Sequence, residues 1–563
     1  MRRKVMKNQT NYPLNEVESF STLREMITKR AENDGDKTAF KFVHNKTDMA
    51  KTYREFYLDT VYLGTKLTGM GIENKHISCI GHNSYEWLVV YLCTLSSNNV
   101  FIPIDKDLPS GDIINVINHS EANVVFCDEK YEKLFEENKD KFENPVKFVS
   151  FSDKETDGFL NYYKMLEEGK TLYDNGDMCF LNQKPNDVNE LKSILYTSGT
   201  TGRSKGVMLS EKNIVSGVYY GLRVSSVFDT CLSVLPYHHA YESVCDILVS
   251  LHKGSTICIN NNLKQVLNNL KKYQPSYIML VPAVVEMFYS KIQKNIKKTG
   301  KEKGFNLLIK LSRGLRKIGI DKRRVLFKDI HDVFGGRMIK IVCGGAPIRP
   351  EIGEFFDDIG INLISGYGIT ECAPLVSCNR DYFNDTATVG TVLPCLKVKI
   401  DEPNAEGIGE IMVKGDVVMM GYYKSQEQTD EVLKDGWFYT GDYGKFNDKE
   451  QLMITGRKKN LIVLSNGKNV FPEEIEEYIS SIPEVSEVVV YSKKNSDGDE
   501  KGLTAQIYLD PELPLSEADL KKKVSAALSE LPIYKQVHEI VLRDEPFEKT
   551  TSNKIKRQKY IEQ

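Results

Sequence analysis

The sequence predicts an α/β fold, in which a large N-terminal region of mostly parallel sheets flanked by helices precedes a small α+β region. Short apolar runs alternate with helical stretches through most of the chain, a pattern typical of buried parallel strands. After Gly409, Gly and Asp turns separate the runs, which indicates antiparallel strands. The length of 563 residues also exceeds what one compact core accommodates.

The expected strands of the first region are short apolar segments, and the first two flank a helix-like stretch at Ser84–Ser96. These strands are His76–Ile80, Val100–Ile104, Ala122–Cys127, Val146–Phe151, Ser193–Thr197, Thr230–Leu235, Thr256–Ile259, Tyr277–Val281 and Lys340–Cys343. The antiparallel part begins with Ile411–Lys414 and Leu452–Thr455. The pattern therefore predicts a sheet-rich body that extends to about residue 457.

The α+β region begins after a boundary that we place near Arg457–Asn460. Pro472 followed by two glutamates is a typical helix start, because proline fits the first turn and acidic side chains favour the N-terminal end. The expected elements are an apolar loop at Leu461–Leu464, helices at Pro472–Ile482 and Ser516–Leu531, and strands at Val485–Tyr491, Leu503–Leu509 and Glu539–Leu542.

Composition excludes several classes of protein. The 75 Lys and Arg residues nearly balance the 78 Asp and Glu residues, so a dedicated nucleic-acid binder is not expected. The 11 cysteines include no C-x-x-C pair, which argues against a zinc site or a disulfide framework and fits a reducing compartment. No apolar run reaches the ~20 residues that span a bilayer, and the basic N-terminus is not followed by the apolar core of a signal peptide. We therefore expect a cytoplasmic protein.

The strongest motif is YTSGTTGRSKGV, Tyr196–Val207, where an apolar strand leads into consecutive Thr, Ser and Gly residues and then a cation. Glycines let backbone N–H groups approach an anion, and hydroxyls donate hydrogen bonds to phosphate oxygens. The pattern differs from the P-loop of NTPases. The candidate phosphate-binding residues are Thr197, Ser198, Gly199, Thr200, Thr201, Gly202 and Lys205.

This segment resembles the phosphate loop of the acyl-adenylate-forming (AMP-binding) superfamily, which includes acyl-CoA synthetases, adenylation domains and luciferases. Further motifs follow in the order of that family, and GYGITECAP and GRKKNLIVLSNGKNVFPEEIE are most similar to long-chain fatty acid–CoA ligases. The resemblance covers residue 20 to the end. It implies an N-terminal AMP-binding and acyl-binding domain at 1–457, with a small β-barrel-like region, and a mobile C-terminal domain at 458–563.

SGYGITE, Ser365–Glu371, carries three of the residues that the resemblance implicates. Tyr367, followed by Gly368, is expected to offer an exposed ring face to adenine, Thr370 to contact the α-phosphate and Glu371 to hold Mg²⁺. A carboxylate suits a hard cation that bridges phosphate oxygens. Read without the resemblance, the same residues form an ordinary turn with a surface glutamate.

Two further motifs complete the nucleotide site that the resemblance implies. The loop GGAPI follows the strand Ile341–Cys343 and is expected to line the adenine pocket with Gly344, Gly345, Ala346 and Pro347. YTGD, Tyr439–Asp442, supplies Asp442 for the ribose hydroxyls, and Arg457, fifteen residues later, adds a second ribose contact.

The remaining assignments concern the acyl group and the catalytic lysine. In PYHHAYE, Pro236–Glu242, the resemblance places His239 near the reacting carboxylate, whereas we expect His238 to be a half-buried structural residue. Lys554 in KTTSNKIKR matches the family's catalytic lysine; Asn553 stands where the family usually has glycine, and Asn tolerates left-handed backbone well. Lys459 matches the hinge about which the C-terminal domain rotates.

The resemblance implies that ATP and a fatty acid form acyl-AMP and pyrophosphate, and that CoA then accepts the acyl group. The similarity to long-chain fatty acid–CoA ligases predicts a long-chain acid. An acyl carrier protein as acceptor, or a shorter or aromatic carboxylic acid as substrate, stays open. A luciferase-like oxygenase and a non-catalytic relative are the more distant alternatives, and all the expected polar residues of the motifs are present.

The stretch Lys291–Lys328 differs from the rest in charge, with fourteen Lys and Arg residues against Glu302 and Asp321, a local net charge of +12. As a solvated amphipathic helix pair it needs no function. It could instead rest on anionic lipid at the inner membrane face, or contact the 3′-phosphate of CoA.

Overall fold

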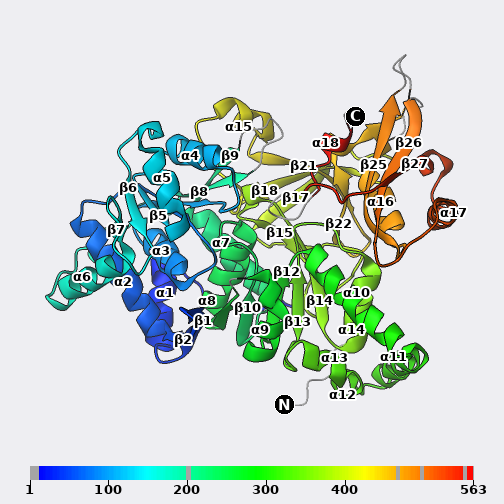
Figure 1. The fold of residues 1–563 in the computed structure, drawn as a ribbon, viewed down its shortest axis with the longest axis horizontal. Coiled ribbons are helices and arrows are strands. Elements are labelled where there is room, and N and C mark those ends of the chain that lie inside the picture. The colour runs from blue at the N-terminus through cyan, green and yellow to red at the C-terminus, as the bar shows by residue number, and fades with distance from the viewer. Residues whose placement is uncertain are drawn as a thin grey trace. The chain divides into compact units, whose positions relative to one another are not determined.

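The computed structural model describes residues 12–197, 204–260, 262–464, 469–494, 500–549 and 555–561 (Figure 1). The chain divides into two compact units: Met1–Lys397 with Val413–Phe438, and Val398–Met412 with Tyr439–Gln563. The division passes through three strands, β17 (Leu396–Asp401), β18 (Gly409–Gly415) and β21 (Trp437–Phe446). The boundary expected near Arg457–Asn460 lies within the second unit and stays a prediction.

The described residues of the first unit form a series of short strands with helices between them. The strands are β1 (Thr38–His44), β2 (Thr47–Thr52), β3 (His76–Ile80), β4 (Val100–Ile104), β5 (Val124–Cys127), β6 (Lys147–Ser150), β7 (Leu160–Asn161), β8 (Leu191–Thr197), β9 (Lys205–Ser210), β10 (Thr230–Ser233), β11 (Thr256–Ile259), β12 (Tyr277–Leu280), β13 (Lys340–Cys343), β14 (Asn362–Gly368), β15 (Leu375–Cys378), β16 (Thr391–Val392), β19 (Gly421–Tyr422) and β20 (Leu433–Lys434).

The helices of the first unit flank its sheets (Figure 1). They are α1 (Leu23–Asn33), α2 (Tyr53–Gly69), α3 (Tyr85–Leu95), α4 (Ser110–His119), α5 (Glu132–Glu137), α6 (Tyr162–Asp174), α7 (Glu211–Val224), α8 (Val249–Lys253), α9 (Val266–Tyr273), α10 (Pro282–Lys298), α11 (Glu302–Lys317), α12 (Arg323–Leu326), α13 (Lys328–Val333), α14 (Pro350–Ile359) and α15 (Gln426–Val432). Hydroxyl side chains start several of them: Thr52 accepts a hydrogen bond from the backbone of Glu55, and Ser84 does so from Trp87.

Two large sheets organise the first unit. The nine-stranded sheet has the order β16-β15-β14-β13-β12-β10-β11-β1-β2, and all pairs from β14 to β1 are parallel. The eight-stranded sheet has the order β19-β9-β8-β4-β3-β5-β6-β7 and is parallel from β8 to β7. The predicted α/β class with mostly parallel sheets is confirmed.

The order of the larger sheet reverses at β10, because the chain continues from β10 to β11 on one side and then to β12 on the other. Loops at the carboxyl ends of parallel strands gather along one edge of a sheet, and a reversal of strand order opens a crevice there. The loops after β10 and β13 carry PYHHAYE and GGAPI, and GYGITE begins in the last three residues of β14 and continues into the turn after it. The topology therefore brings three of the sequence motifs to one sheet edge.

The second unit contains the remaining strands and helices. They are β22 (Leu452–Arg457), β23 (Ile462–Val463), β24 (Asn469–Val470), β25 (Val485–Lys494), β26 (Glu500–Leu509), β27 (Val537–Arg543), α16 (Pro472–Ser480), α17 (Glu517–Ala527) and α18 (Gln558–Ile561). A three-stranded sheet, β25-β26-β27, packs its apolar side against α16 and α17. None of the helices in the described parts of either unit has the length and apolarity needed to cross a membrane.

Candidate active site

The predicted phosphate loop joins two antiparallel strands of the first unit. Thr197 ends β8, Lys205 begins β9, and these two residues face each other in the strand ladder. The pairing holds the two ends of the loop together at the end of a hairpin. The other candidates of this loop, Ser198, Gly199, Thr200, Thr201 and Gly202, lie outside the described residues.

The GYGITE turn follows β14 directly. Thr370 and Glu371 lie in a 3-10 helix, Thr370–Cys372, after which β15 runs back antiparallel to β14. A Cβ atom at Gly368 would lie 2.1 Å from the carbonyl oxygen of Pro374, so the close approach of the two strands requires glycine there. Glu371 is only 8% exposed, which excludes the surface glutamate that an ordinary turn would present.

A short segment of backbone connects this turn to the strand that leaves the phosphate loop. The N–H of Met419 donates to the carbonyl of Glu371 at 2.8 Å, and the N–H of Tyr423 donates to the carbonyl of Gly206 at 2.7 Å. Between them, β19 pairs antiparallel with β9. The residues from 419 to 423 therefore tie the carboxyl end of β14 to the beginning of β9.

Tyr422, on that segment, brings together two of the predicted site residues. Its hydroxyl donates to Oε1 of Glu371 at 2.9 Å, and the ammonium of Lys205 lies 4.9 Å from the centre of its ring. Such a cation–ring contact is favourable because the ring face is electron-rich. Burial, and then the charge of Glu371, raises the pKa of Tyr422, so the hydroxyl stays protonated and remains a donor. The sequence analysis did not single out Tyr422.

The adenine-site candidates lie on neighbouring strands. β13 and β14 are parallel, with Cys343 facing Ser365, so GGAPI and Tyr367 emerge at the same sheet edge. Gly344 is buried, and a Cβ atom there would lie 3.1 Å from the ring of Tyr241. Gly345, Ala346 and Pro347 are exposed. Tyr367 is 9% exposed, which is less than the open ring face expected from its flanking glycines.

The histidine motif follows β10 and precedes a π-helix, Tyr241–Leu248. His239 is half-buried, and its ring centre lies 4.2 Å from that of His238. Burial, followed by the neighbouring His239, lowers the pKa of His238 well below its usual value. His238 is therefore a neutral, half-buried side chain.

The same π-helix carries two fully buried carboxyl groups, Glu242 and Asp246, which the sequence analysis did not identify. The hydroxyl of Ser233 donates to Glu242 at 2.5 Å, and that of Ser250 donates to Asp246 at 3.1 Å. Burial raises the pKa of both groups, and the proximity of Asp246 raises that of Glu242 further. The folded pair therefore retains at least one proton up to near-neutral pH, where the same carboxyl groups in the unfolded chain are ionised.

In the second unit, the two predicted ribose-binding residues contact each other. Asp442 on β21 faces Arg457 on β22, and Nε of Arg457 lies 3.0 Å from Oδ1 of Asp442. Asp442 is buried and Arg457 is exposed. The fifteen residues from Asp442 to Arg457 therefore lead from one strand of a β-hairpin to the facing position on the other.

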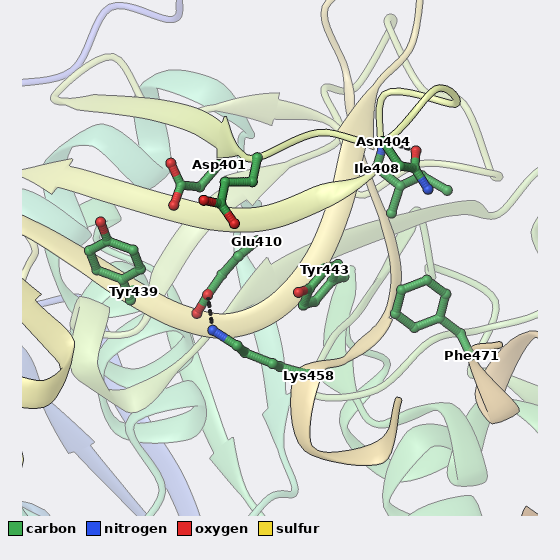
Figure 2. Close-up of a pocket in the computed structure, with 9 residues that line it drawn as sticks. Asp401, Asn404, Ile408, Glu410, Tyr439, Tyr443, Lys458 and Phe471 are labelled. Atoms are coloured by element: carbon green, nitrogen blue, oxygen red, sulfur yellow. Dashed lines mark hydrogen bonds and ion pairs between the residues drawn. The ribbon is translucent and has the colours of Figure 1, made fainter. Parts of the chain in front are cut away.

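Glu410 supports this hairpin and the predicted hinge together. One of its oxygens accepts from the N–H of Gly441 at 3.1 Å, and the other lies 2.6 Å from Nζ of Lys458, whose pKa this bond raises. Lys459 follows in the 3-10 helix Lys458–Asn460 and is exposed. Figure 2 shows the Glu410–Lys458 pair at a cavity of about 330 Å³ that Tyr443 and Phe471 also line.

Near the end of the second unit, the residues on either side of the segment that contains Lys554 contact each other. Lys549 and Ile555 form an isolated bridge, and Lys554 between them lies outside the described residues. Arg557 reaches the buried Glu476 at 2.6 Å, which anchors the chain after the segment to α16. The flanks of the predicted catalytic loop are therefore fixed to the body of the second unit.

The residues present fit a magnesium ion that arrives with its nucleotide better than a permanently bound one. No group of three or more His, Cys, Asp or Glu side chains able to hold a metal occurs in the described parts of the chain. Mg²⁺ in ATP-dependent enzymes commonly uses one or two carboxylates together with phosphate oxygens and water. Glu371, oriented by Tyr422 next to the end of the phosphate loop, can supply such a carboxylate.

Comparison with known families and sequences agrees with these motifs. Residues 27–423 match a family described as AMP-binding enzyme. Long chain acyl-CoA synthetase 1 of Arabidopsis thaliana is 30% identical over 482 residues, covering 79% of this chain and 72% of the relative. Long-chain-fatty-acid–CoA ligase 5 of Rattus norvegicus is 29% identical over 470 residues, covering 78% and 69%.

Solved structures with similar folds are more distant in sequence. The anthranilate CoA ligase AuaEII in complex with anthranoyl-AMP aligns with a TM-score of 0.78 at 16% identity, covering 96% of this chain and 97% of that one. ATP-bound MatB from Rhodopseudomonas palustris aligns with a TM-score of 0.74 at 22% identity, covering 96% and 98%. At these identities the likeness establishes the fold alone.

The buried carboxyl pair predicts a pH dependence of stability. Because the folded state raises the pKa of Asp246, its contribution is complete below the usual pKa of aspartate and is lost as pH rises through the folded value. We expect the free energy of unfolding to decline between about pH 4 and pH 8, and Asp246→Asn to reduce that decline by about 1–3 kcal/mol.

Urea unfolding at stepped pH measures this decline. The exposed Asp112 provides the control, because Asp112→Asn removes a carboxyl from the surface and should leave the wild-type slope unchanged. Equal slopes for wild type and Asp246→Asn would show that the folded state does not raise the pKa of Asp246.

Proposed function

We propose that this chain, which belongs to the AMP-binding enzyme family, activates a long-chain fatty acid with ATP and transfers it to CoA. The chain is an acyl-adenylate-forming CoA ligase by family match and by its relatives. The observation that supports the proposal most is the approach of Lys205 and Glu371 to opposite parts of Tyr422, beside the end of the phosphate loop.

The first step is adenylation. A carboxylate oxygen of the acid attacks the α-phosphorus of ATP, the bond to the bridging oxygen of the β-phosphate breaks, and pyrophosphate leaves. Negative charge accumulates on the phosphates, and fixed donors and cations that meet this charge lower the barrier. In our assignment Lys554 bridges the carboxylate and α-phosphate, Thr370 holds the α-phosphate, and Lys205 with its loop holds the outer phosphates.

Different residues would bind the metal and the ribose in this assignment. Glu371 would hold Mg²⁺, which when bound neutralises charge on the phosphate oxygens. Asp442 would accept hydrogen bonds from the ribose hydroxyls, and its contact with Arg457 holds the carboxylate in place. A buried carboxylate paired with an exposed guanidinium suits this role because it is fixed before the nucleotide arrives.

The second step forms the thioester. The thiol sulfur of CoA attacks the acyl carbon of the mixed anhydride, the bond to the phosphate oxygen breaks, and AMP leaves. His239 would lie near the reacting carboxylate at the acyl entrance. A lysine bound to that carboxylate obstructs the thiol, so we assign Lys459 as the hinge that moves Lys554 away between the two steps.

The substrate class follows from the relatives. Two of them are named as long-chain enzymes, whereas one structural neighbour is a ligase for an aromatic acid. An ATP–pyrophosphate exchange screen tests the proposal with palmitate, oleate, octanoate, acetate, benzoate and anthranilate. We expect the fastest exchange with palmitate or oleate, at least about tenfold above anthranilate.

The same screen identifies the acceptor when CoA or an acyl carrier protein is added and the thioester and AMP are quantified by chromatography. We expect acyl-CoA and AMP in equal amounts. Exchange with anthranilate or benzoate alone would replace the fatty acid by an aromatic substrate, and thioester formation on the carrier protein alone would replace CoA as acceptor.

Separate assays of the two half-reactions test the roles of the lysines. Lys554→Ala removes the cation assigned to the carboxylate and α-phosphate, so we expect adenylation to fall by about 10²- to 10³-fold while synthetic acyl-AMP still reacts with CoA. Lys459→Pro restricts the hinge and should spare adenylation while it slows the thiol step.

Lys556→Ala is the matched control, because Lys556 lies two residues further along, is exposed and pairs with Glu548. It should leave both half-reactions within about twofold of wild type. An equal loss of both half-reactions in Lys554→Ala would contradict its assignment to adenylation.

Tyr422 provides a test of the site geometry that does not require catalysis. Tyr422→Phe keeps the ring below Lys205 but removes the hydrogen bond to Glu371, and a hydrogen bond to a charged group contributes about 1.5–3 kcal/mol. We expect MgATP to bind about tenfold more weakly by titration calorimetry, with a similar rise in KM for ATP and a smaller change in kcat.

The neighbouring Tyr423→Phe is the control, since the hydroxyl of Tyr423 donates to Glu121 rather than to Glu371. If Tyr422→Phe and Tyr423→Phe bind MgATP equally well, Tyr422 does not orient the Glu371 carboxylate.

A further inference from the structure

Helix α11 of the first unit has two faces of different character. Figure 1 shows it at the margin of the ribbon, beside α14. Its inner face packs Phe305, Leu308 and Ile309 against the core of the larger sheet. Next to these side chains, Arg313 pairs with Asp358 and Arg316 pairs with Asp357, both on α14. These arginines of the basic stretch therefore serve to attach the helix.

The opposite face of α11 exposes large apolar side chains. Leu307, Leu311 and Ile318 are 67%, 50% and 71% exposed. Leu307 and Leu311 lie one turn apart along the helix, and Ile318, seven residues further, is the residue that caps its C-terminal end. A single exposed leucine is ordinary on a protein surface, whereas a row of three along one helix indicates contact with an apolar partner.

A row of lysines runs beside this apolar row. Lys303, Lys310 and Lys317 follow one another at intervals of seven residues and are all exposed. None of the three forms an ion pair within the part of the chain that the structure describes, in contrast to Arg313 and Arg316. The helix thus separates its cations: the arginines pair with carboxylates of α14, and the lysines are left for solvent.

We propose that this outer face of α11, consisting of Leu307, Leu311, Ile318, Lys303, Lys310 and Lys317, binds the surface of an anionic lipid bilayer. In an interfacial helix the apolar side chains enter the boundary between headgroups and acyl chains, and adjacent lysines contact acidic headgroups. Each lysine near such a surface contributes favourably, and long lysine side chains reach the headgroups while their methylene groups stay apolar.

The arrangement favours lipid over a second copy of this chain. In a symmetric dimer through this face, the lysine row of one copy would lie against the lysine row of the other, and like charges in contact oppose association. An anionic bilayer offers an apolar boundary to the leucine row and acidic headgroups to the lysine row. The proposal goes beyond the ligase activity and does not depend on it, because membrane binding can be measured without ATP, acid or CoA.

Vesicle co-sedimentation of the full chain tests the proposal. The vesicles consist of phosphatidylcholine alone or with about one third phosphatidylglycerol, at low salt and at about 0.5 M salt. We expect binding to the anionic vesicles only, with most of it lost at high salt. Lys303→Gln/Lys310→Gln/Lys317→Gln should weaken the partition coefficient by about 100-fold, and Leu307→Ser/Leu311→Ser by at least about tenfold.

The matched control is Leu263→Ser/Lys264→Gln, which removes a leucine of 63% exposure and an adjacent exposed lysine at a different place on the first unit. It should bind vesicles like the wild type. Circular dichroism and the unfolding midpoint should be unchanged in all variants, since every altered side chain is exposed.

Three results would overturn the proposal. Wild-type protein that does not sediment with anionic vesicles at low salt has no such surface, and equal binding by the α11 variants places the surface elsewhere. Self-association of the wild type without vesicles, abolished by Leu307→Ser/Leu311→Ser, would make the face an interface between copies.

Discussion

The candidate site of the first unit depends on the short segment from 419 to 423, which is hydrogen-bonded on both sides. One side joins the turn that carries Glu371, and the other joins β9 just after the phosphate loop. These two structures belong to different sheets and are far apart in the sequence. The segment therefore helps to hold the Glu371 turn beside β9. The hydroxyl and ring of Tyr422 complete this link with two side-chain contacts.

The two units divide the groups that the proposed chemistry requires. The first unit supplies the phosphate-loop strands, the Glu371 turn and the edge of a parallel sheet, all held by extensive backbone pairing. The second supplies the Asp442–Arg457 hairpin and the anchored tail around Lys554. Glu410 contacts both Gly441 in the hairpin and Lys458, so one carboxylate holds the proposed ribose contacts and the residue that precedes the proposed hinge. This suits an enzyme in which rigid binding groups adjoin a point of rotation.

Much of the architecture could be predicted because buried parallel strands are short, apolar and separated by turns. The strands from His76–Ile80 to Lys340–Cys343 lie within a few residues of their expected bounds, and the family resemblance is confirmed. The hairpin β1–β2 was not predicted, since most of β2 is exposed and shows no apolar alternation. Tyr422 and Glu410 gave no local signal, because their contacts join residues tens of positions away. The resemblance assigned Asp442 and Arg457 to the same ribose, but their contact across a hairpin was not predicted, and the burial of Tyr367 depends on packing that the motif does not encode.

Hydrogen–deuterium exchange with and without MgATP tests most directly whether the Glu371 turn and the phosphate-loop strands form one nucleotide site. The account predicts that exchange slows by about tenfold or more in residues 197–205, in 369–373 and in 419–423 together, because the segment couples the other two. Slower exchange in residues 197–205 with no change in 369–373 and 419–423 would contradict it, since the bound phosphates would then not involve the turn that carries Glu371.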